Sequence, residues 1–349
     1  MIVIRHLAAE EALVAADPDL RAEAISALDF WTPLMLRAAA DAGVVTAFGM
    51  QRRSSRAVAE ETGLHPDTLR RVLRALAARG IFYEDDDGEH FALTEVGRVL
   101  LPEHPASVWY AVNWHPWALH AWAEFSHTLR TGEAAFLRHH GASFFDYLAA
   151  DEQAGAKFDS DMRRRTTALL DLAIPLFDSW PAEGTVVDVG GGTGALLSRL
   201  LRDRPGLRGV LFDQPDVLER AVEVLAAAGV ADRVEQVAGD FFVDIPSGHN
   251  LYVMASVLHD WDDEHAGRIL ERCAAAMPPH GRLLLFEGVL RGPNEPDTFK
   301  NLDLHMAVLL GGRERSPDEW EDLLTASGFR LSRIVPTPGL AWIEAYAST

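Results

Sequence analysis

The chain has 349 residues, 48% of them apolar and 24% charged, and this length suggests two or three domains of ordinary globular composition. No apolar run approaches the roughly 20 residues that a membrane span needs, and a formal net charge of −20 disfavours binding to nucleic acid or to anionic membranes. The single cysteine, Cys273, excludes an internal disulfide, and Glu10, Glu11 and Asp17 stand where an export signal would be apolar. We therefore expect a cytoplasmic protein.

The first hundred residues have the periodicity of helices. The stretch from Phe30 to Phe48 predicts a buried helix that ends near Gly43, and residues 54–82 predict two helices joined at Gly63. The stretch "IFYEDDDGEHFALT" that follows predicts a hairpin of two short strands. Helix, turn, helix and hairpin in this order form a winged helix, which we place at residues 1–104.

A winged helix can bind DNA, so a ligand-sensing regulator is one alternative for this chain. Several arginines between residues 52 and 79 favour that alternative. The four acids from Glu84 to Asp87, however, lie at the tip of the predicted hairpin, where they would meet phosphates with the wrong sign. We therefore expect this domain to serve packing and dimerisation, with no nucleic acid and no membrane among its partners.

Aromatic residues are dense between residues 105 and 180, where the pattern is again helical. Trp109, Trp114, Trp117 and Trp122 lie close together in the sequence. Singly such residues form cores, but together they also suit the wall of a pocket for a flat or apolar ligand. We expect residues 105–180 to form a helical linker that lines the substrate pocket.

From residue 181 to residue 349, apolar runs of strand length alternate with helical stretches. The runs are "TVVDVG", "RGVLFD", "VEQVAGDFF", "NLYVMASVL" and "GRLLLFEGVL". This alternation predicts a parallel sheet with helices on both faces. The predicted fold class is therefore α/β, a Rossmann-like doubly wound domain that follows the mainly α winged helix.

A glycine-rich turn follows the first predicted strand of this domain. Gly190 and Gly192 lie between the strand and the next helix, where a bare backbone can adopt positive φ and approach a ligand closely. Asp213 ends the second strand, and a carboxylate there can accept hydrogen bonds from both hydroxyls of a ribose. These features predict a nucleoside cofactor, but the glycines alone also satisfy the dinucleotide fingerprint.

Three further acidic or aromatic residues favour S-adenosylmethionine over a dinucleotide. Asp188 lies just before the glycines, where an anion suits a cationic amino group better than a pyrophosphate. Asp240 and Phe241 follow the third strand, where a carboxylate can accept the adenine amino group and an aromatic face can pack on the ring. S-adenosylmethionine carries an amine, a ribose and an adenine without any phosphate, so it matches this set.

The sequence also resembles a known family. The stretches that carry the resemblance are, in order, "VVDVGGGTG", "LFDQPDVLERA", "RVEQVAGDFF", "SVLHDWDDEHAGRIL", "LLLFEGVL" and "GGRERSPDEWEDLLTASGF". They resemble the small-molecule O-methyltransferases of the plant caffeate and bacterial polyketide type. The resemblance implies a homodimer with interlocking N-terminal domains and a place in secondary metabolism such as antibiotic biosynthesis. Many bacterial relatives have Ser-Arg before "VLHDW", and this chain has Ala255 and Ser256, so Ser256 is expected beside the cofactor.

The catalytic candidate is His259, in the stretch "LHDWDDEH" after the fourth strand. An imidazole with an ordinary pKa of about 6.5 can accept a proton from a phenol, whose pKa is about 10. We predict His259 as the general base of O-methylation, with Asp260 beside it. The resemblance implies two glutamates that flank this histidine, and the matching residues are Glu287 and Glu314.

Two other mechanisms stay open. His259, Asp260 and His305 are two histidines and a carboxylate, a ligand set for a divalent metal ion with open coordination positions. In some relatives such a triad serves the C-methylation of a 2-oxo acid, in which the metal stabilises the enolate. A member of the family that binds the cofactor without transferring a methyl group is the remaining alternative. The presence of both Glu287 and Glu314 favours the base mechanism.

Overall fold

The computed structural model describes residues 18–104, 106–112 and 115–348, and the chain divides into two compact units, Met1–Trp114 and His115–Thr349. The acidic residues at positions 10–17 and Trp114, on which expectations rest, lie outside the described residues. Among the helices that are described, none combines the length and the apolar character needed to cross a bilayer.

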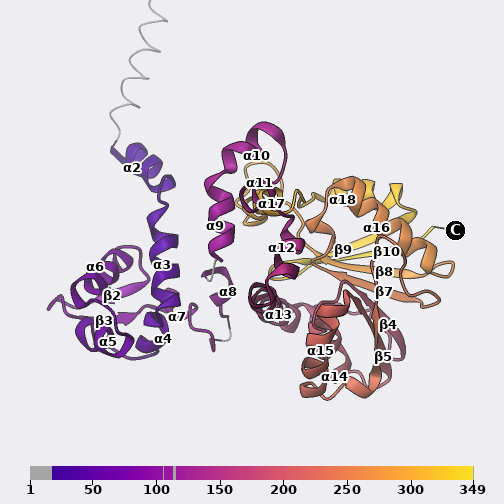
Figure 1. Cartoon of the computed structure of the whole chain (residues 1–349), viewed down its shortest axis with the longest axis horizontal. Helices are drawn as coiled ribbons and strands as arrows, with labels where there is room; N and C mark the ends of the chain where they lie inside the picture. Colours follow the sequence, from indigo (N-terminus) through magenta and orange to yellow (C-terminus); the bar gives the residue numbers. More distant parts are fainter. Residues whose placement is uncertain (1–17, 105, 113–114, 349) are drawn as a thin grey trace, which may run out of the picture. The chain divides into compact units, whose positions relative to one another are not determined.

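The first unit is mainly helical and contains a small antiparallel sheet of strand order β1-β3-β2 (Figure 1). Its elements are α2 (Pro18–Ala27), α3 (Trp31–Asp41), α4 (Val44–Phe48), β1 (Arg53–Ser54), α5 (Ser55–Thr62), α6 (Pro66–Ala77), β2 (Phe82–Glu84), β3 (His90–Leu93), α7 (Glu95–Arg98) and α8 (Trp109–Val112). The predicted pair of helices joined at Gly63 is confirmed, and Gly63 ends α5 at a φ of 70°. The hairpin β2–β3 is also confirmed.

The predicted buried helix near the N-terminus is only partly correct. The helix ends at Asp41, and Gly43, with a φ of 75°, separates it from α4, as expected. On α3 itself, however, only Ala39 and Ala40 are buried. Phe30 and Trp31 are each 60% exposed. The predicted helix is therefore present, but its N-terminal end at Phe30 and Trp31 is not covered by the core of its own unit.

The second unit contains helices in its first half and the large sheet in its second half. Before the sheet come α9 (Pro116–Ala123), α10 (Phe125–Thr131), α11 (Ala135–His140), α12 (Phe144–Ala150), α13 (Glu152–Ala173) and η1 (Ile174–Leu176). The sheet and its helices follow as β4 (Gly184–Val189), α14 (Ala195–Arg202), β5 (Leu207–Asp213), α15 (Pro215–Ala227), η2 (Ala231–Arg233), β6 (Val234–Ala238), β7 (Leu251–Ala255), η3 (Leu258–Asp260), α16 (Asp263–Ala276), β8 (Arg282–Glu287), α17 (Phe299–Leu309), α18 (Pro317–Ala326), β9 (Phe329–Pro336) and β10 (Ala341–Ala347).

The large sheet has the strand order β6-β5-β4-β7-β8-β10-β9. The five strands from β6 to β8 are parallel, as predicted, whereas β10 pairs antiparallel with both β8 and β9. The chain moves from β4 to β5 on one side and later returns to place β7 on the other side. Such a reversal of strand order opens a crevice at the carboxyl ends of the strands, where ligands bind in doubly wound folds.

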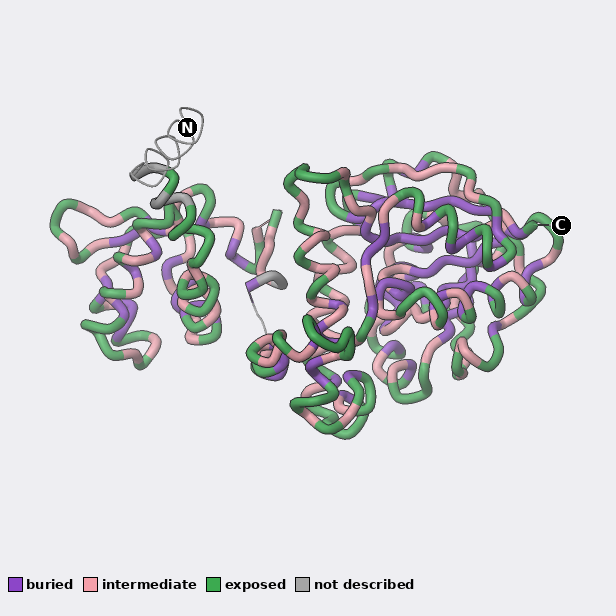
Figure 2. Tube along the Cα trace, turned by 90° about the horizontal axis from the view of Figure 1, so that it is seen from above, coloured by how far each residue is buried: buried purple, intermediate pink, exposed green. Residues whose placement is uncertain are grey.

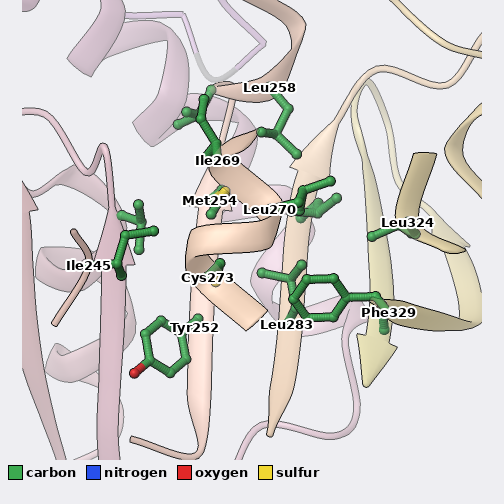
Figure 3. Packing of buried hydrophobic residues seen from close by; sticks show 14 of the residues in the cluster. Ile245, Tyr252, Met254, Leu258, Ile269, Leu270, Cys273, Leu283, Leu324 and Phe329 are labelled. Atoms are coloured by element: carbon green, nitrogen blue, oxygen red, sulfur yellow. The ribbon is translucent and has the colours of Figure 1, made fainter. Parts of the chain in front are cut away.

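Helices cover both faces of this sheet with apolar side chains, so β4, β5, β7, β8 and β10 are buried along most of their length, whereas the edge strands β6 and β9 are not (Figure 2). Helices α16 and α18 cover one face, and α13, α14 and α15 cover the other. Figure 3 shows the first of these cores, where Ile269 and Cys273 of α16 pack against Met254 of β7 and its neighbours. A strand buried on both faces reads as a continuous apolar run, which is why these strands were visible in the sequence.

A smaller apolar cluster joins the helices before the sheet to α17. It contains Trp117, Phe136 and Phe144 from α9, α11 and α12, together with Val308 and Leu309 of α17. Segments almost 200 residues apart in the chain therefore share one core. This cluster positions α17, which carries His305.

Candidate active site

The glycine-rich turn lies at the carboxyl end of β4, at the reversal of strand order. Gly190, Gly192 and Gly194 have φ values of 67°, 59° and 82°, a region that favours glycine. A Cβ on Gly191 would lie 2.5 Å from a methyl carbon of Leu211 and 2.6 Å from the carboxylate of Asp188. The turn therefore consists of glycines because its backbone has positive φ values and because the side chains of Leu211 and Asp188 pack directly beneath it.

Asp188 is the acid beneath this turn. Its side chain is fully buried, and neither carboxylate oxygen has a hydrogen-bond partner among the described residues. Burial, together with the nearby charge of Asp213, raises the pKa of Asp188 to about 8. A buried carboxyl group that lacks a partner is costly, so its position calls for a ligand that can donate to it.

Asp213 and Asp240 end the next two strands. Asp213 accepts hydrogen bonds of 2.7 Å from the backbone N–H groups of Gly192 and Gln214, and burial raises its pKa although these two bonds lower it. Asp240 is exposed and accepts a 2.8 Å hydrogen bond from the N–H of Phe242. Because β5 lies between β6 and β4, Asp213 stands between Asp240 and the glycine turn, and it is bonded to the turn itself.

Phe241 and Val257 connect the glycine turn to the catalytic candidate. A Cβ on Gly190 would lie 3.0 Å from Val257 and 3.6 Å from the ring of Phe241. The Phe241 ring also contacts Trp261 edge-on, with 6.0 Å between centroids. Because Val257 and Trp261 flank His259, the structure brings the turn and the histidine to the same edge of the sheet.

His259 lies in the single turn η3 and is 3% exposed. Its Nδ1 lies 2.8 Å from Oε1 of Glu314 and 3.9 Å from Oε2 of Glu287. Its Nε2 lies 3.4 Å from Oδ1 of Asp260. The four residues predicted as the catalytic group are thus brought together, with two buried glutamates on one side of the ring and one partly buried aspartate on the other.

The carboxylates dominate the electrostatics of this group. Burial alone would lower the pKa of His259, but the charges of Glu314, Glu287 and Asp260 raise it to about 9. Burial raises the pKa of Glu287 to about 7 and that of Asp260 to about 6, while the His259 charge opposes both increases. The surrounding carboxylates therefore favour the cationic form of the imidazole.

Both glutamates are held in place by the backbone. Oε1 of Glu287 accepts hydrogen bonds from the N–H groups of Val257 (2.9 Å) and Leu258 (2.8 Å). The N–H of Glu314 donates to Asp303 at 2.9 Å. A Cβ on Gly288 would lie 2.2 Å from Oε2 of Glu314, so only glycine leaves room for that carboxylate. The remaining oxygen, Oε2, of each glutamate has no partner among the described residues.

Ser256 directly follows β7, just before this loop, and has an unusual backbone. Its φ is 56°, a left-handed conformation that costs a residue with a Cβ about 1 kcal/mol or more. Its N–H donates to the carbonyl of Phe286 at 3.0 Å, which keeps the strained residue in register with β8. The strain turns the chain sharply from the strand toward His259.

His305 is not gathered into the predicted metal triad. Two groups of three histidine or acidic side chains within the described ranges have ligand atoms within 4.8 Å of one another, and neither contains His259, Asp260 or His305. Nε1 of Trp122 donates to Nδ1 of His305 at 2.8 Å, which occupies one of its two possible ligand atoms. Burial and the charges of Arg165 and His259 lower the pKa of His305 to about 4.

Comparison with known proteins decides the family. A family model described as "O-methyltransferase domain" matches residues 122–330, and one described as "O-methyltransferase dimerisation domain" matches residues 25–103. The chain belongs to the O-methyltransferase family. The phenazine O-methyltransferase PhzM of Lysobacter antibioticus is 40% identical over 90% of this chain and 93% of its own length.

Solved structures agree with this assignment. The mitomycin 7-O-methyltransferase MmcR has a TM-score of 0.83 and 36% identity, covering 99% of this chain and all of its own. NcsB1 from neocarzinostatin biosynthesis, solved with S-adenosylmethionine and 2-hydroxy-5-methyl naphthoic acid, has a TM-score of 0.77 and 33% identity over 92% of this chain and 98% of its own. This O-methyltransferase is a S-adenosylmethionine-dependent enzyme of small-molecule secondary metabolism, and it carries a dimerisation domain.

Two residues that support the site of this O-methyltransferase were missed in the sequence. Arg315 is fully buried and donates to the carbonyls of Leu258 (3.1 Å) and Trp261 (3.0 Å) on either side of His259. A Cβ on Gly312 would lie 2.2 Å from the carbonyl oxygen of His259. The only signal was their place beside Glu314 in "GGRERS", since spacing alone does not show which loop they contact.

Proposed function

We propose that this O-methyltransferase transfers the methyl group of S-adenosylmethionine to a hydroxyl of an aromatic small molecule, with His259 as the general base. The observation that carries the proposal is the buried imidazole of His259, 2.8 Å from Glu314, at the carboxyl edge of the sheet beside the glycine turn. A base at this edge stands next to the crevice in which doubly wound folds hold their ligands.

The residues around the glycine turn fit S-adenosylmethionine. The two buried oxygens of Asp188 that lack partners would accept the cationic amino group of the methionine portion. Asp213 would accept the ribose hydroxyls, and Asp240 and Phe241 would hold the adenine. The backbone of Gly190 and Gly192, with Ser256 across the crevice, would line the remaining contacts. When bound, S-adenosylmethionine supplies an electrophilic methyl group on a sulfonium sulfur.

His259 would act through its Nε2 atom. A carboxylate can only accept a hydrogen bond, so Nδ1 carries a proton that it donates to Glu314, and Nε2 is then the atom that removes the proton from the acceptor hydroxyl. Glu287 and Glu314 are positioning residues that hold this tautomer and stabilise the imidazolium formed in the step. Asp260, 3.4 Å from Nε2, stabilises the same positive charge from the other side.

The basicity of His259 must fall for this step to occur at neutral pH. In the ligand-free protein the surrounding carboxylates raise that pKa to about 9, which favours the imidazolium over the neutral base. A positive charge in the crevice disfavours the imidazolium and lowers that pKa. A cation in the crevice would therefore increase the share of neutral His259 that can act as the base.

The acceptor we propose is a planar phenol. The similar proteins named above act, by their names, on phenazine and mitomycin compounds, and NcsB1 was solved with a naphthoic acid. Aromatic rings also flank the His259 loop here, since Phe145 stacks on Trp261 with 6.1 Å between centroids. Trp122 and Phe158 lie in the adjoining apolar cluster. Flat apolar walls of this kind suit a flat acceptor.

We also propose a homodimer formed through the first unit. Leu28, Phe30, Trp31 and Leu34 are 74%, 60%, 60% and 42% exposed, an apolar surface of a kind that monomers seldom leave open. These residues lie at and after the start of the matched dimerisation domain. In this proposal residues 1–104 form the winged-helix dimerisation domain, residues 105–180 the pocket-lining linker, and residues 181–349 the catalytic domain. Substitution of Trp31 by Glu should shift the mass in analytical ultracentrifugation toward the monomer.

The function is tested by product analysis. The purified enzyme is incubated with S-adenosylmethionine and a panel of phenols, and both S-adenosylhomocysteine and the methyl ether are quantified by mass spectrometry. We expect equimolar formation of the two products, and a loss of about 10²-fold or more in the His259→Asn variant. Binding of S-adenosylhomocysteine to that variant shows that it is folded. Full activity of the variant, or consumption of the donor without a methyl ether, would overturn the proposal.

A further inference from the structure

Three histidines gather on the helices before the sheet, away from the catalytic group. His120 lies in the last turn of α9, and His139 and His140 end α11, which packs against α9. One ring nitrogen from each of the three lies within 4.8 Å of the others. His120 and His139 are exposed and His140 is half-buried, so an ion could reach the cluster from solvent.

His139 is already oriented as a metal ligand would be. Its Nδ1 lies 2.9 Å from Oε1 of Glu124, and Nε of Arg138 donates to Oε2 of the same carboxylate at 2.9 Å. Paired with the Arg138 guanidinium, the carboxylate of Glu124 acts as an acceptor toward His139. Nδ1 of His139 therefore carries the proton, and its Nε2 presents the lone pair.

His140 is oriented by a second outer partner. Its Nε2 lies 3.1 Å from the carbonyl oxygen of Trp117, which can only accept, so Nε2 carries the proton and Nδ1 presents the lone pair. The rings of Phe136 and Tyr147 pack against it at 4.3 and 4.9 Å between centroids.

We propose that His120, His139 and His140 form a binding site for a divalent transition-metal ion of the zinc class, which ties α9 to α11. Metal-bound histidines characteristically donate their second ring N–H to a carboxylate or a backbone carbonyl, and Glu124 and Trp117 supply one of each. Zinc–nitrogen bonds of about 2.0–2.1 Å in a tetrahedron need nitrogens about 3.3 Å apart. Rotation of the exposed His120 side chain, with small adjustments of His139 that keep its bond to Glu124, closes that distance, and water fills the fourth position.

The chemistry of the three ligands selects the ion. Three neutral imidazoles favour zinc, copper, nickel or cobalt over magnesium and calcium, which prefer oxygen ligands. The net charge of −20 attracts cations of any kind and so does not discriminate among them. The ion would hold together two helices of the apolar cluster that also packs against α17, so its effect would be on the stability of this region.

The second histidine-containing group serves as an internal contrast. It consists of Asp85, Asp87 and His90 in the hairpin of the first unit. Asp87 already accepts hydrogen bonds from the N–H groups of Glu89 and His90 and contacts the His90 ring, and Arg52 pairs with Asp85. Its ligand atoms are thus occupied by the protein, and no lone pair is directed at a common point.

The test uses the full chain after removal of metals with a chelator. Zinc chloride is titrated by calorimetry and by thermal denaturation, and cobalt chloride is followed by its visible absorption. We expect one equivalent to bind, a Tm that rises with zinc concentration, and a cobalt spectrum of tetrahedral intensity. His120→Asn, which changes an exposed side chain, should weaken binding at least tenfold, and Glu124→Gln should weaken it by about 10- to 100-fold through the outer partner.

The matched control is His90→Asn, which should leave zinc affinity unchanged. A triple variant at positions 120, 139 and 140 should abolish the bound equivalent, and its circular dichroism shows whether it is folded. The proposal is refuted if the wild-type chain binds no saturable zinc at micromolar concentration. It is also refuted if His120→Asn binds as tightly as the wild type, or if His90→Asn rather than His120→Asn removes the site.

Discussion

Replacing Asp188 by Asn should make the ligand-free enzyme more stable at alkaline pH and should weaken its hold on the cofactor. The change removes the ionisable group but keeps its size. In the folded chain the pKa of Asp188 rises from 3.8 to about 8, because the carboxyl group is buried without a partner. The folded state therefore binds a proton that the unfolded state releases across this interval, so the contribution to stability is fully present below pH 3.8 and is lost as the pH rises through about 8.

The change in stability can be calculated from the pKa interval between 3.8 and about 8. At about 1.4 kcal/mol per pKa unit, ionising Asp188 in the folded chain costs on the order of 5 kcal/mol. The buried amide of the Asn variant also lacks a partner and costs about 1–3 kcal/mol. The variant should therefore gain about 2–4 kcal/mol above pH 8, which is about 4–16 °C in Tm for a unit of the size of residues 115–349. At pH 5 the gain should vanish or reverse.

Two measurements check this prediction. Thermal unfolding from pH 5 to pH 10 compares Asp188→Asn with the wild type and with Asp232→Asn, an exposed aspartate in η2. Calorimetric titration with S-adenosylhomocysteine should show a loss of about 10- to 100-fold in affinity, as expected for one charge-assisted hydrogen bond. A parallel loss of stability with pH in the variant and the wild type would show that burial does not raise the pKa of Asp188. Equal affinities for S-adenosylhomocysteine would show that Asp188 does not hold the cationic amino group.

The remaining predictions concern the glycine turn, the catalytic histidine and the metal. Gly191→Ala should lower the Tm by several degrees and weaken cofactor binding, since overpacking costs about 1–3 kcal/mol. The matched control is Gly267→Ala in α16, where the new Cβ would lie 3.6 Å from the nearest atom and should be tolerated. Glu314→Gln should reduce kcat by about 10²-fold and lower the pH at the midpoint of the pH–rate profile, because it removes the charge that raises the pKa of His259 most. An unchanged midpoint in stopped assays from pH 6 to pH 10 would contradict this prediction. Chelation should leave kcat unchanged, and activity that disappears with the metal and returns with it would revive the metal mechanism.

The sequence was most informative about strands that are buried on both faces. The runs that became β4, β5, β7 and β8 are continuous and apolar, which made both the sheet and its parallel pairing predictable. The last two strands were not predicted. In the first half of β9 the exposed and less exposed positions alternate, and its antiparallel pairing with β10 depends on partners outside its own sequence. No local pattern in the sequence therefore predicts this strand or its pairing.

The site was predictable to the extent that its residues end strands. Asp188, Asp213 and Glu287 each stand at the carboxyl end of an apolar run, and parallel strands bring such ends to one edge. Arg315 was not predictable, because its hydrogen bonds reach a loop more than 50 residues away. The same limit applied to α3, whose exposed aromatic residues have the pattern of a buried helix.

The electrostatics of the crevice link cofactor binding to catalysis. Burial raises the pKa of Asp188, and the surrounding carboxylates raise the pKa of His259, so both side chains hold a proton more strongly than they would in water. A cation held in the crevice favours ionised Asp188 and neutral His259 at once, since both changes remove a proton from its surroundings. In the proposed mechanism the two positive charges of S-adenosylmethionine act in this direction, the ammonium on Asp188 and the sulfonium on His259. The product S-adenosylhomocysteine keeps the ammonium and lacks the sulfonium charge, so in the same proposal Asp188 stays ionised while the pKa of His259 rises again once the methyl group has moved.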